Sequence, residues 1–420
     1  MTVLFTDAGT TGGAGDGSSA AARVERALQS IDHTEPDVRA WVRVDADGAR
    51  AAARALDGRA AERRGPLHGL PFGVKDIVDV AGQPTECGSV LRRGRVAQAD
   101  AWLVSRLRAA GAVPVGKTVT TEFAYFAPGP TRNPVALDRT PGGSSSGSAA
   151  AVAAGNVPLA LGSQTAGSLT RPASYCGVTG FVAPVGRVST AGVVGLSHTL
   201  DSVGLLTRRV EDLRPVLEAV GLVEHVVTAP RPAHVQVWFG EGVSEVEADM
   251  RAAVDRAAGA VADEGRVAGF TFAEVAERAT QLQQVVMGFE AVRLRAEEAR
   301  HPEHLSEPLN ALFEQGRRTS DEEYARAVEA RSVLRAGVLA TLEDVDAVLG
   351  PAAQGVAPVG LGATGSPVLS RAWQFLGLPV VTVAGLRDGR GLPLGVQLIG
   401  HPLRVRRLLD VAAWLETRIR

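Results

Sequence analysis

Two lysines are candidate chemical groups because they are the only lysines in a chain of 420 residues, Lys75 and Lys117. Lysine and arginine together number 44, and every other member of that set is an arginine. A coding bias toward arginine replaces lysine wherever a permanent charge suffices, but not where an amine must lose its proton. We therefore predict that at least one of the two lysines has a chemical role.

Serines are concentrated in two segments that follow Lys75 along the chain. Ser144 lies in the loop Pro141-Gly142-Gly143-Ser144-Ser145-Ser146-Gly147-Ser148, and Ser168 ends the segment Gln164-Thr165-Ala166-Gly167-Ser168. A serine hydroxyl is a poor nucleophile until a neighbour takes its proton. Lysine can take that proton only when it is neutral, so its pKa must fall from ~10.4 toward the working pH. Burial at an apolar strand end disfavours the ammonium form and supplies such a shift.

The elements around these residues alternate between helices and short apolar strands, which predicts an α/β fold. Ahead of them, residues 21–63 have a helical pattern. We expect a strand at Phe72–Val74 that ends at Lys75, and a strand at Ala112–Val115 that leads to Lys117. Between and after these come a helix, a long loop, a helix and a strand, at Ala101–Ala110, 127–148, Ser148–Ala154 and Val157–Leu161. Loops as long as 127–148 inside a compact domain are usually functional.

The remainder of the chain divides into a helical region and a return to strands. Residues 245–343 are mostly helical in pattern, around one strand near Val267–Phe272. Later elements are expected as three strands and a closing helix, at Ala347–Leu349, Val380–Val383, Gly395–Ile399 and Arg404–Arg418. Residues 1–20 are rich in Gly, Ser, Thr and Asp, and we expect them to form a mobile tail.

Composition excludes several classes of protein. A net charge of −2 argues against binding to nucleic acid through phosphate contacts. Two cysteines, Cys87 and Cys176, are too few for a disulfide framework. The most apolar stretch, Ala149–Leu161, is shorter than the ~20 residues of a membrane helix, and the N-terminus lacks a secretion pattern. The eight histidines show no metal-ligand spacing. We expect a cytoplasmic protein without a membrane segment, a metal or a nucleic-acid partner.

One short motif has a second interpretation. Gly143-Ser144-Ser145-Ser146-Gly147 matches the Gly-x-Ser-x-Gly elbow of α/β-hydrolases. That motif requires a strand running directly into the central serine. Here the preceding segments, Thr131-Arg132-Asn133-Pro134 and Thr140-Pro141, are typical of a loop. The sequence therefore disfavours an elbow nucleophile.

The order and spacing of the three segments around Lys75, Ser144 and Ser168 resemble the amidase signature family. The resemblance runs from about residue 21 to the C-terminus and is most specific over 64–210. Four further motifs agree with it: Pro66-Leu67-His68-Gly69-Leu70-Pro71, Thr131-Arg132-Asn133-Pro134, Arg171-Pro172-Ala173-Ser174-Tyr175-Cys176-Gly177 and Gly391-Leu392-Pro393-Leu394-Gly395-Val396-Gln397. The resemblance implies a mixed, mostly parallel sheet sandwiched between helices. It also implies one domain over 21–420, with a core of 64–220 and 345–420 and a helical insertion at about 225–345.

The resemblance also implies roles for individual residues. Ser168 falls at the nucleophile, Lys75 at the base, and Ser144 at the bridging serine, whose peptide bond is cis in the family. Backbone N–H groups of Thr165, Ala166 and Gly167 would form the oxyanion hole. By the family's layout Tyr125 lines the acyl pocket. No cofactor or metal is required, and Lys117 is expected to be structural.

Two departures from the family pattern lie close to the site. The family often has Asp-Thr-Gly-Gly-Ser followed by an arginine two residues after the nucleophile. Here Gln164 replaces the aspartate, Ala166 the first glycine, and Thr170 the arginine, with Arg171 one residue later. Val182-Ala183-Pro184 stands where the family usually has Lys-Pro-Thr. Neither departure removes Lys75, Ser144 or Ser168.

The predicted function is hydrolysis of a small-molecule carboxylic amide through an acyl-enzyme on Ser168, releasing ammonia or an amine. One alternative is the glutaminase subunit of a tRNA-dependent amidotransferase. The short chain and the different Gln164 motif argue against it. Another is acyl transfer, or other amide or ester chemistry, in a biosynthetic pathway. A binding module without activity is the fourth, which the intact Lys75, Ser144 and Ser168 disfavour. The sequence also allows a homo-oligomer.

Overall fold

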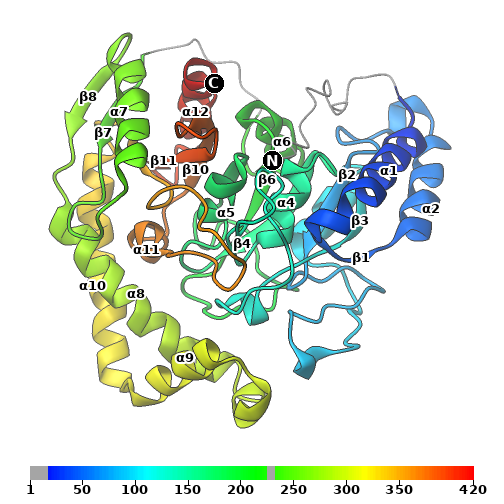
Figure 1. Ribbon diagram of the computed structural model, residues 1–420, viewed down its shortest axis with the longest axis horizontal. Coiled ribbons are helices and arrows are strands. Elements are labelled where there is room, and N and C mark those ends of the chain that lie inside the picture. Colours follow the sequence, from blue (N-terminus) through cyan, green and yellow to red (C-terminus); the bar gives the residue numbers. More distant parts are fainter. Residues whose placement is uncertain (1–17, 225–231) are drawn as a thin grey trace.

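The computed structural model describes residues 18–224 and 232–420, and its centre is one sheet of eleven strands (Figure 1). The strand order is β1-β3-β2-β4-β6-β5-β10-β11-β9-β7-β8. Most of the tail expected at 1–20 lies outside the described residues. The strands are β1 Trp41–Val44, β2 Pro71–Lys75, β3 Val113–Thr118, β4 Leu159–Gln164, β5 Thr179–Val182, β6 Ser202–Thr207, β7 His234–Val237, β8 Arg266–Gly269, β9 Ala347–Pro351, β10 Val380–Arg387 and β11 Pro393–Gly400.

The sheet is mixed, as predicted. Its parallel pairs form two blocks, β3-β2-β4 and β9-β7-β8. The other neighbouring pairs are antiparallel. The expected parallel pairing therefore holds within these two blocks and not for the other pairs of neighbouring strands. The first block carries Lys75, because β2 lies between its two parallel neighbours and ends at that residue.

Helices cover both faces of the sheet. The longer helices are α1 Ala20–Val38, α2 Ala46–Asp57, α3 Trp102–Ala109, α4 Ser146–Ala153, α5 Thr170–Cys176, α6 Leu213–Ala219, α7 Ala248–Ala262, α8 Ala273–Leu294, α9 Glu307–Arg318, α10 Asp321–Thr341, α11 Val368–Phe375 and α12 Val405–Ile419. A Cβ atom on Gly395 of β11 would touch Ser174 of α5, whereas one on Gly400 would touch Leu408 of α12. Residues five apart on a strand point to opposite faces, so α5 and α12 sandwich β11.

The region predicted as a helical insertion also contributes to the sheet. Helices α8, α9 and α10 extend away from the rest of the chain, at the lower left of Figure 1. Strands β7 and β8 precede them and continue the sheet beyond β9. We keep the division into a core of 64–220 and 345–420 with an insertion at 225–345 as a proposal. The continuous sheet supports one domain over 21–420.

The sequence pattern did not predict several of the observed elements. Residues 21–63 had a helical pattern, yet β1 interrupts them at the sheet edge with only its first residue buried. Helix α5 and strand β5 lie in a Ser, Thr and Gly-rich stretch without apolar periodicity. Both are buried at every position, so neither has the polar face that produces an alternating pattern. Tertiary packing, not local preference, defines these segments.

Helix α4 carries the serine-rich loop toward the sheet and depends on small residues. All eight of its residues are buried, as expected for a helix of Ser, Gly, Ala and Val packed closely against its neighbours. A Cβ atom on Gly147 would lie 2.2 Å from the carbonyl oxygen of Ala40 and 2.3 Å from the amide nitrogen of Val119. Only glycine permits this approach, which fixes the helix beside the ends of β2 and β3.

The two lysines occupy neighbouring strands but opposite faces of the sheet. Lys75 is in register with Thr118, whereas Lys117 is in register with Val74. Consecutive side chains on a strand alternate between faces, so the two amines enter different environments. The amine of Lys117 lies 3.0 Å from the Asp76 carboxylate and donates to the Thr85 hydroxyl at 2.8 Å. Both members of the Lys117–Asp76 pair are about 1% exposed. This geometry supports the structural role expected for Lys117.

Replacing Lys117 with methionine should destabilise the protein strongly. The substitution leaves the Asp76 carboxylate buried without a counter-ion, which typically costs about 3–5 kcal/mol. The free energy of unfolding in urea measures this loss. The double variant Lys117→Met/Asp76→Asn removes both charges, and its amide oxygen can still accept the Glu86 N–H that now reaches Asp76 at 3.1 Å. We expect it to recover most of the stability.

The control is Arg326→Met, which removes an exposed i,i+4 pair with Glu322 on α10. Such pairs contribute at most about 1 kcal/mol. Equal losses for Lys117→Met and Arg326→Met, or a double variant no more stable than Lys117→Met, would contradict the interpretation of a buried structural pair.

Candidate active site

Lys75 is completely buried and its amine is surrounded by serine hydroxyls. The amine nitrogen lies 2.6 Å from the Ser144 oxygen, 2.8 Å from that of Ser163 and 3.1 Å from that of Ser145. Its relative exposure is 0%. The position follows from the local sequence, because the buried strand β2 ends at Lys75 while α4 and β4 bring the serines toward it.

Three oxygen neighbours suit both protonation states of an amine. An ammonium group has three donors and can donate to all three hydroxyls. A neutral amine has two donors and one lone pair, so it can donate to two hydroxyls and accept from the third. Ser144 has the shortest contact, at 2.6 Å. The cluster can therefore move one proton between Ser144 and Lys75 without leaving a buried polar group unpaired.

Burial also makes the neutral amine accessible near neutral pH. Removal from water lowers the pKa of Lys75 to about 7, and the charge of Asp201 opposes part of this shift. Burial raises the pKa of Asp201 itself to about 6. No carboxylate forms an ion pair with Lys75 among the described residues, in contrast to the Lys117–Asp76 pair.

The Ser144 backbone has the conformation that the family resemblance implies, since the Gly143–Ser144 peptide bond is cis. The Gly143 carbonyl accepts a hydrogen bond of 2.5 Å from the Arg171 guanidinium. A Cβ atom on Gly143 would lie 2.8 Å from a methyl carbon of Thr364. The loop is thus held between α5 and the segment that precedes α11, with Ser144 only 2% exposed.

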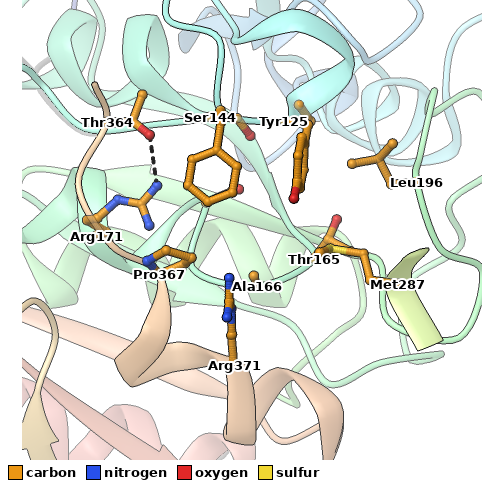
Figure 2. Close-up of a pocket in the computed structure, with 13 residues that line it drawn as sticks. Tyr125, Ser144, Thr165, Ala166, Arg171, Leu196, Met287, Thr364, Pro367 and Arg371 are labelled. Atoms are coloured by element: carbon orange, nitrogen blue, oxygen red, sulfur yellow. Dashed lines mark hydrogen bonds between the residues drawn. The ribbon is translucent and has the colours of Figure 1, made fainter. Parts of the chain in front are cut away.

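Ser144 and Ser168 line one cavity, shown in Figure 2. The cavity is lined by Ala124, Tyr125, Phe126, Ser144, Thr165, Ala166, Ser168, Arg171, Leu196, Met287, Thr364, Pro367 and Arg371. Ser168 is half-buried, so a ligand in the cavity can reach it. Lys75 lies behind Ser144, outside the lining, so Ser144 lies between the Lys75 amine and the cavity.

The segment proposed as the oxyanion hole is fixed from two sides. The Thr165 hydroxyl donates to the Asp201 carboxylate, and the Thr165 carbonyl accepts from the Gln283 side chain at 2.9 Å. Thr165 and Ala166 line the cavity, whereas Gly167 packs against Pro367. Within the described part of the chain, no protein acceptor pairs with the Ala166 or Gly167 N–H group. Rigid N–H groups beside a nucleophile are what an oxyanion requires.

Gln164 supports the same segment, which explains how the chain tolerates this departure from the family pattern. Its side-chain oxygen accepts from the N–H groups of Leu169 at 3.0 Å and Thr170 at 3.1 Å, at the start of α5. Its amide nitrogen donates to Gln374 of α11 at 3.2 Å. Gln164 therefore closes residues 165–168 into a bridge between the end of β4 and α5.

Tyr125 lies in the cavity wall within an unusual stretch of backbone. Burial raises the pKa of its hydroxyl, while the Arg371 charge opposes that shift. Its neighbours Phe123, Ala124 and Phe126 have positive φ angles of 45°, 62° and 38°. Such conformations are strained for residues other than glycine and cluster at functional sites. The pocket position is observed, and a substrate-binding role for Tyr125 stays a prediction.

Three side chains at the site were not found from the sequence. Ser163 contacts Lys75 from β4, Asp201 contacts the oxyanion segment, and Arg371 enters the cavity from α11. Ser163 had a usable signal, because it lies one residue before the Gln164 segment and side chains alternate along a strand. Asp201 and Arg371 had none, since they reach the site only through tertiary packing.

The structure also resolves the alternative motif at 143–147. No strand runs into Ser145, since the preceding residues of the loop from β3 contain only a short 3₁₀ turn, at Glu122–Ala124. The Ser145 hydroxyl is fully buried, and the Ser163 N–H donates to it at 3.3 Å. Ser145 does not line the cavity. Its side chain organises Lys75 instead.

Two further properties concern the described residues as a whole. No cluster of three or more His, Cys, Asp or Glu side chains is arranged there to hold a metal ion. None of the helices in residues 18–224 and 232–420 has the length and hydropathy needed to cross a membrane.

Known proteins match nearly the entire chain. The family model described as Amidase matches residues 22–409. A glutamyl-tRNA(Gln) amidotransferase subunit of Anaeromyxobacter dehalogenans (strain 2CP-C) is 35% identical over 460 residues, covering 94% of this chain and 92% of that protein.

Solved structures agree with those matches. An amidase crystal structure is 30% identical with a TM-score of 0.86, covering 96% of this chain and 97% of that one. An inhibitor-bound protein, from a vestigial complex that reveals the origins of an s-triazine catabolic enzyme, is 32% identical. Its TM-score is 0.86, and the coverage is again 96% and 97%.

The acylation rate should depend on pH through Lys75. Below its pKa of about 7 the amine is an ammonium and cannot accept a proton, so kcat/KM should fall about tenfold per pH unit. The negative charge of Asp201 favours the ammonium, so Asp201→Asn should lower the pKa of Lys75 and move the rising limb to lower pH. The variant should also be slower, because Thr165 and the Ser197 N–H donate to different oxygens of Asp201, and asparagine replaces one of those oxygens with an NH₂ group that cannot accept.

The control is Asp212→Asn, whose carboxyl interacts with Glu211, Arg209 and Arg420 rather than with Lys75. It should leave the midpoint unchanged. A midpoint that stays fixed or moves to higher pH in Asp201→Asn, measured as kcat/KM between pH 5 and 9, would show that Asp201 does not influence the base.

Proposed function

Because this chain belongs to the amidase-signature family and is an enzyme that hydrolyses amide bonds, we propose that Lys75, Ser144 and Ser168 are its catalytic triad. The observation that carries this proposal is the buried amine of Lys75, 2.6 Å from the Ser144 hydroxyl and without a carboxylate partner among the described residues. A structural lysine requires a counter-ion, as Lys117 has in Asp76. A general base requires the opposite environment, which Lys75 has.

In the proposed acylation step, the Ser168 oxygen attacks the carbonyl carbon of a small amide. The Ser168 proton passes to Ser144, and the Ser144 proton passes to the neutral amine of Lys75. The same route then returns the proton from Lys75 to the leaving nitrogen as the carbon–nitrogen bond breaks. Ammonia or an amine departs, and the acyl group stays on Ser168. Attack by water, activated along the same chain, releases the carboxylic acid and restores the hydroxyl.

The oxyanion of each tetrahedral intermediate would be held by the backbone N–H groups of Thr165, Ala166 and Gly167. The hydrogen bonds from Thr165 to Asp201 and from Gln283 to Thr165 support this assignment, because they fix the segment before the substrate arrives. Loss of one oxyanion donor typically costs ~10²–10³ in rate.

A second function is supported by one of the relatives. The match to the amidotransferase protein covers 92% of its length, so the length of this chain does not exclude a glutaminase role. A free-standing amidase should turn over amides without a partner. A glutaminase that belongs to an amidotransferase should release ammonia from glutamine mainly in its complex, which a partner copurifying with the native chain would reveal.

Some sequence predictions extend beyond the family assignment. The net charge of −2 supports the proposal that the chain has no nucleic-acid partner in its own reaction. A cytoplasmic location, a homo-oligomer and an acyl acceptor other than water stay predictions.

The proposed triad predicts selective labelling by an uncharged fluorophosphonate. The parent should gain one adduct, seen by mass spectrometry of the intact protein. Ser168→Ala should lose it and lose activity by roughly 10⁴-fold or more, because no nucleophile remains. Lys75→Ala and Ser144→Ala should label more slowly, by about 10²–10⁴-fold, since proton removal is impaired.

Ser145→Ala is the matched control within the same loop. Its hydroxyl contacts Lys75 without lining the cavity, so the variant should still be labelled. Adducts that persist in Ser168→Ala and vanish in Ser145→Ala would refute the proposed triad and restore the elbow serine as the nucleophile. A parent that is never labelled would mean that the site is inactive.

A further inference from the structure

The cavity contains two arginines without an acidic partner, Arg171 and Arg371. Both line the same space as Ser144 and Ser168. Arg171 is 3% exposed, and its Nε and Nη1 atoms have no hydrogen-bond partner. The Nε atom of Arg371 likewise has none. Neither side chain forms an ion pair with a carboxylate in residues 18–224 or 232–420.

A positioning role explains only part of Arg171. Its Nη2 atom donates to the Gly143 carbonyl and, at 3.3 Å, to the Thr364 hydroxyl, as the dashed line in Figure 2 shows. A guanidinium has five N–H donors, and a lysine would suffice for a single carbonyl. Holding the Ser144 loop therefore does not require the Nε and Nη1 donors, which have no hydrogen-bond partner.

The two guanidinium groups also repel each other. Burial lowers the pKa of Arg171 to about 10, and the charge of Arg371 acts in the same direction. The charged or titratable groups that act on this pair are two tyrosines, Tyr175 on Arg171 and Tyr125 on Arg371. Neither tyrosine is anionic at neutral pH. Arg171 is buried and Arg371 is half-buried. Two like charges held close together without a counter-ion are costly, so the site is electrostatically incomplete without an anion.

Their placement relative to the nucleophile identifies the anion as part of the substrate. Figure 2 shows Arg371 rising from α11 toward Ala166 of the oxyanion segment, with Arg171 entering from the other side beside Pro367. The remaining wall is largely apolar, with Tyr125, Leu196 and Met287. A planar carboxylate matches the donor geometry of guanidinium groups. Both arginines and Ser168 line this one small cavity, so only a short chain fits between that carboxylate and the amide.

Building on the proposed function, we propose that the substrate is a small amide carrying a carboxylate, which Arg171 and Arg371 bind while Ser168 attacks the amide carbonyl. Binding of the carboxylate supplies the missing counter-charge and orients the amide toward the Ala166 segment. Neutral amides of the same shape leave both guanidinium groups without a counter-charge, and the enzyme should discriminate against them.

The test compares succinamate with 4-methylpentanamide, in which an isopropyl group replaces the carboxylate at nearly the same size. For the parent, the ratio of the two kcat/KM values should favour succinamate by roughly 10²-fold or more. Arg371→Met should reduce that ratio at least tenfold. Arg371→Lys should reduce it too, because an ammonium lacks the planar pair of donors. Arg256→Met, at an exposed position of α7, controls for the loss of one positive charge.

Protection of Ser168 from the uncharged fluorophosphonate gives a second measurement. Succinate should slow labelling of the parent in a concentration-dependent way, and less so in Arg371→Met. Protection by phosphate but not by succinate would overturn the assignment to a carboxylate, as would a parent that prefers 4-methylpentanamide. If Arg371→Met does not fold, Arg371→Lys and the parent's own ratio decide the outcome.

The same experiment separates this inference from the function on which it depends. A parent that is labelled on Ser168 and hydrolyses 4-methylpentanamide as well as succinamate retains the amidase proposal and refutes the carboxylate site. A parent that is not labelled refutes the triad itself.

Discussion

The burial of one amine is the constraint on which the site depends. Lys75 ends a strand that lies between two parallel neighbours, and nothing in its surroundings is exposed enough to hydrate an ammonium. Its donors must therefore be satisfied by protein, and the protein supplies hydroxyls rather than a carboxylate. Hydroxyls stabilise both forms of the amine without fixing the charged one. The small residues of α4 follow from the same need, because only a helix without bulky side chains brings Ser144 and Ser145 this close.

Buried cations are treated in three different ways within this fold. Lys117 has a carboxylate at 3.0 Å, which makes it a fixed part of the scaffold. Lys75 has hydroxyls, which leave its proton free to move. Arg171 lines the cavity and keeps two guanidinium nitrogens without a hydrogen-bond partner, although it is only 3% exposed. Burial alone therefore does not indicate function, since all three side chains are buried. The partner decides which cation is structural, which can transfer a proton and which can bind an anion.

Site residues that lie in local sequence motifs are far easier to predict from the sequence than residues that only tertiary packing brings to the site. Lys75 and Ser144 were found from a strand end and a serine-rich loop, and the structure joins them by a hydrogen bond. Ser168 followed from its segment and lines the same cavity. The central strands β2, β3 and β4 were predicted because each is a short apolar run bounded by Gly or Pro. Asp201 and Arg371 lie in no recognisable local motif. The strand order of the sheet and the packing of α11 bring them to the site, and no local sequence pattern predicts either. The buried helix α5 was not predicted for a related reason, because it has no polar face.

The replacement of an aspartate by Gln164 fits the electrostatics of this site. The position must accept two N–H groups at the start of α5, which either a carboxylate or an amide oxygen can do. It also directly follows Ser163, whose hydroxyl contacts Lys75. A second carboxylate here would favour the ammonium form of Lys75, as Asp201 already does. An amide closes the oxyanion segment without adding that charge, and Gln374 satisfies the extra donor that the amide brings. The chain thus keeps the geometry of the segment while Lys75 stays easier to deprotonate.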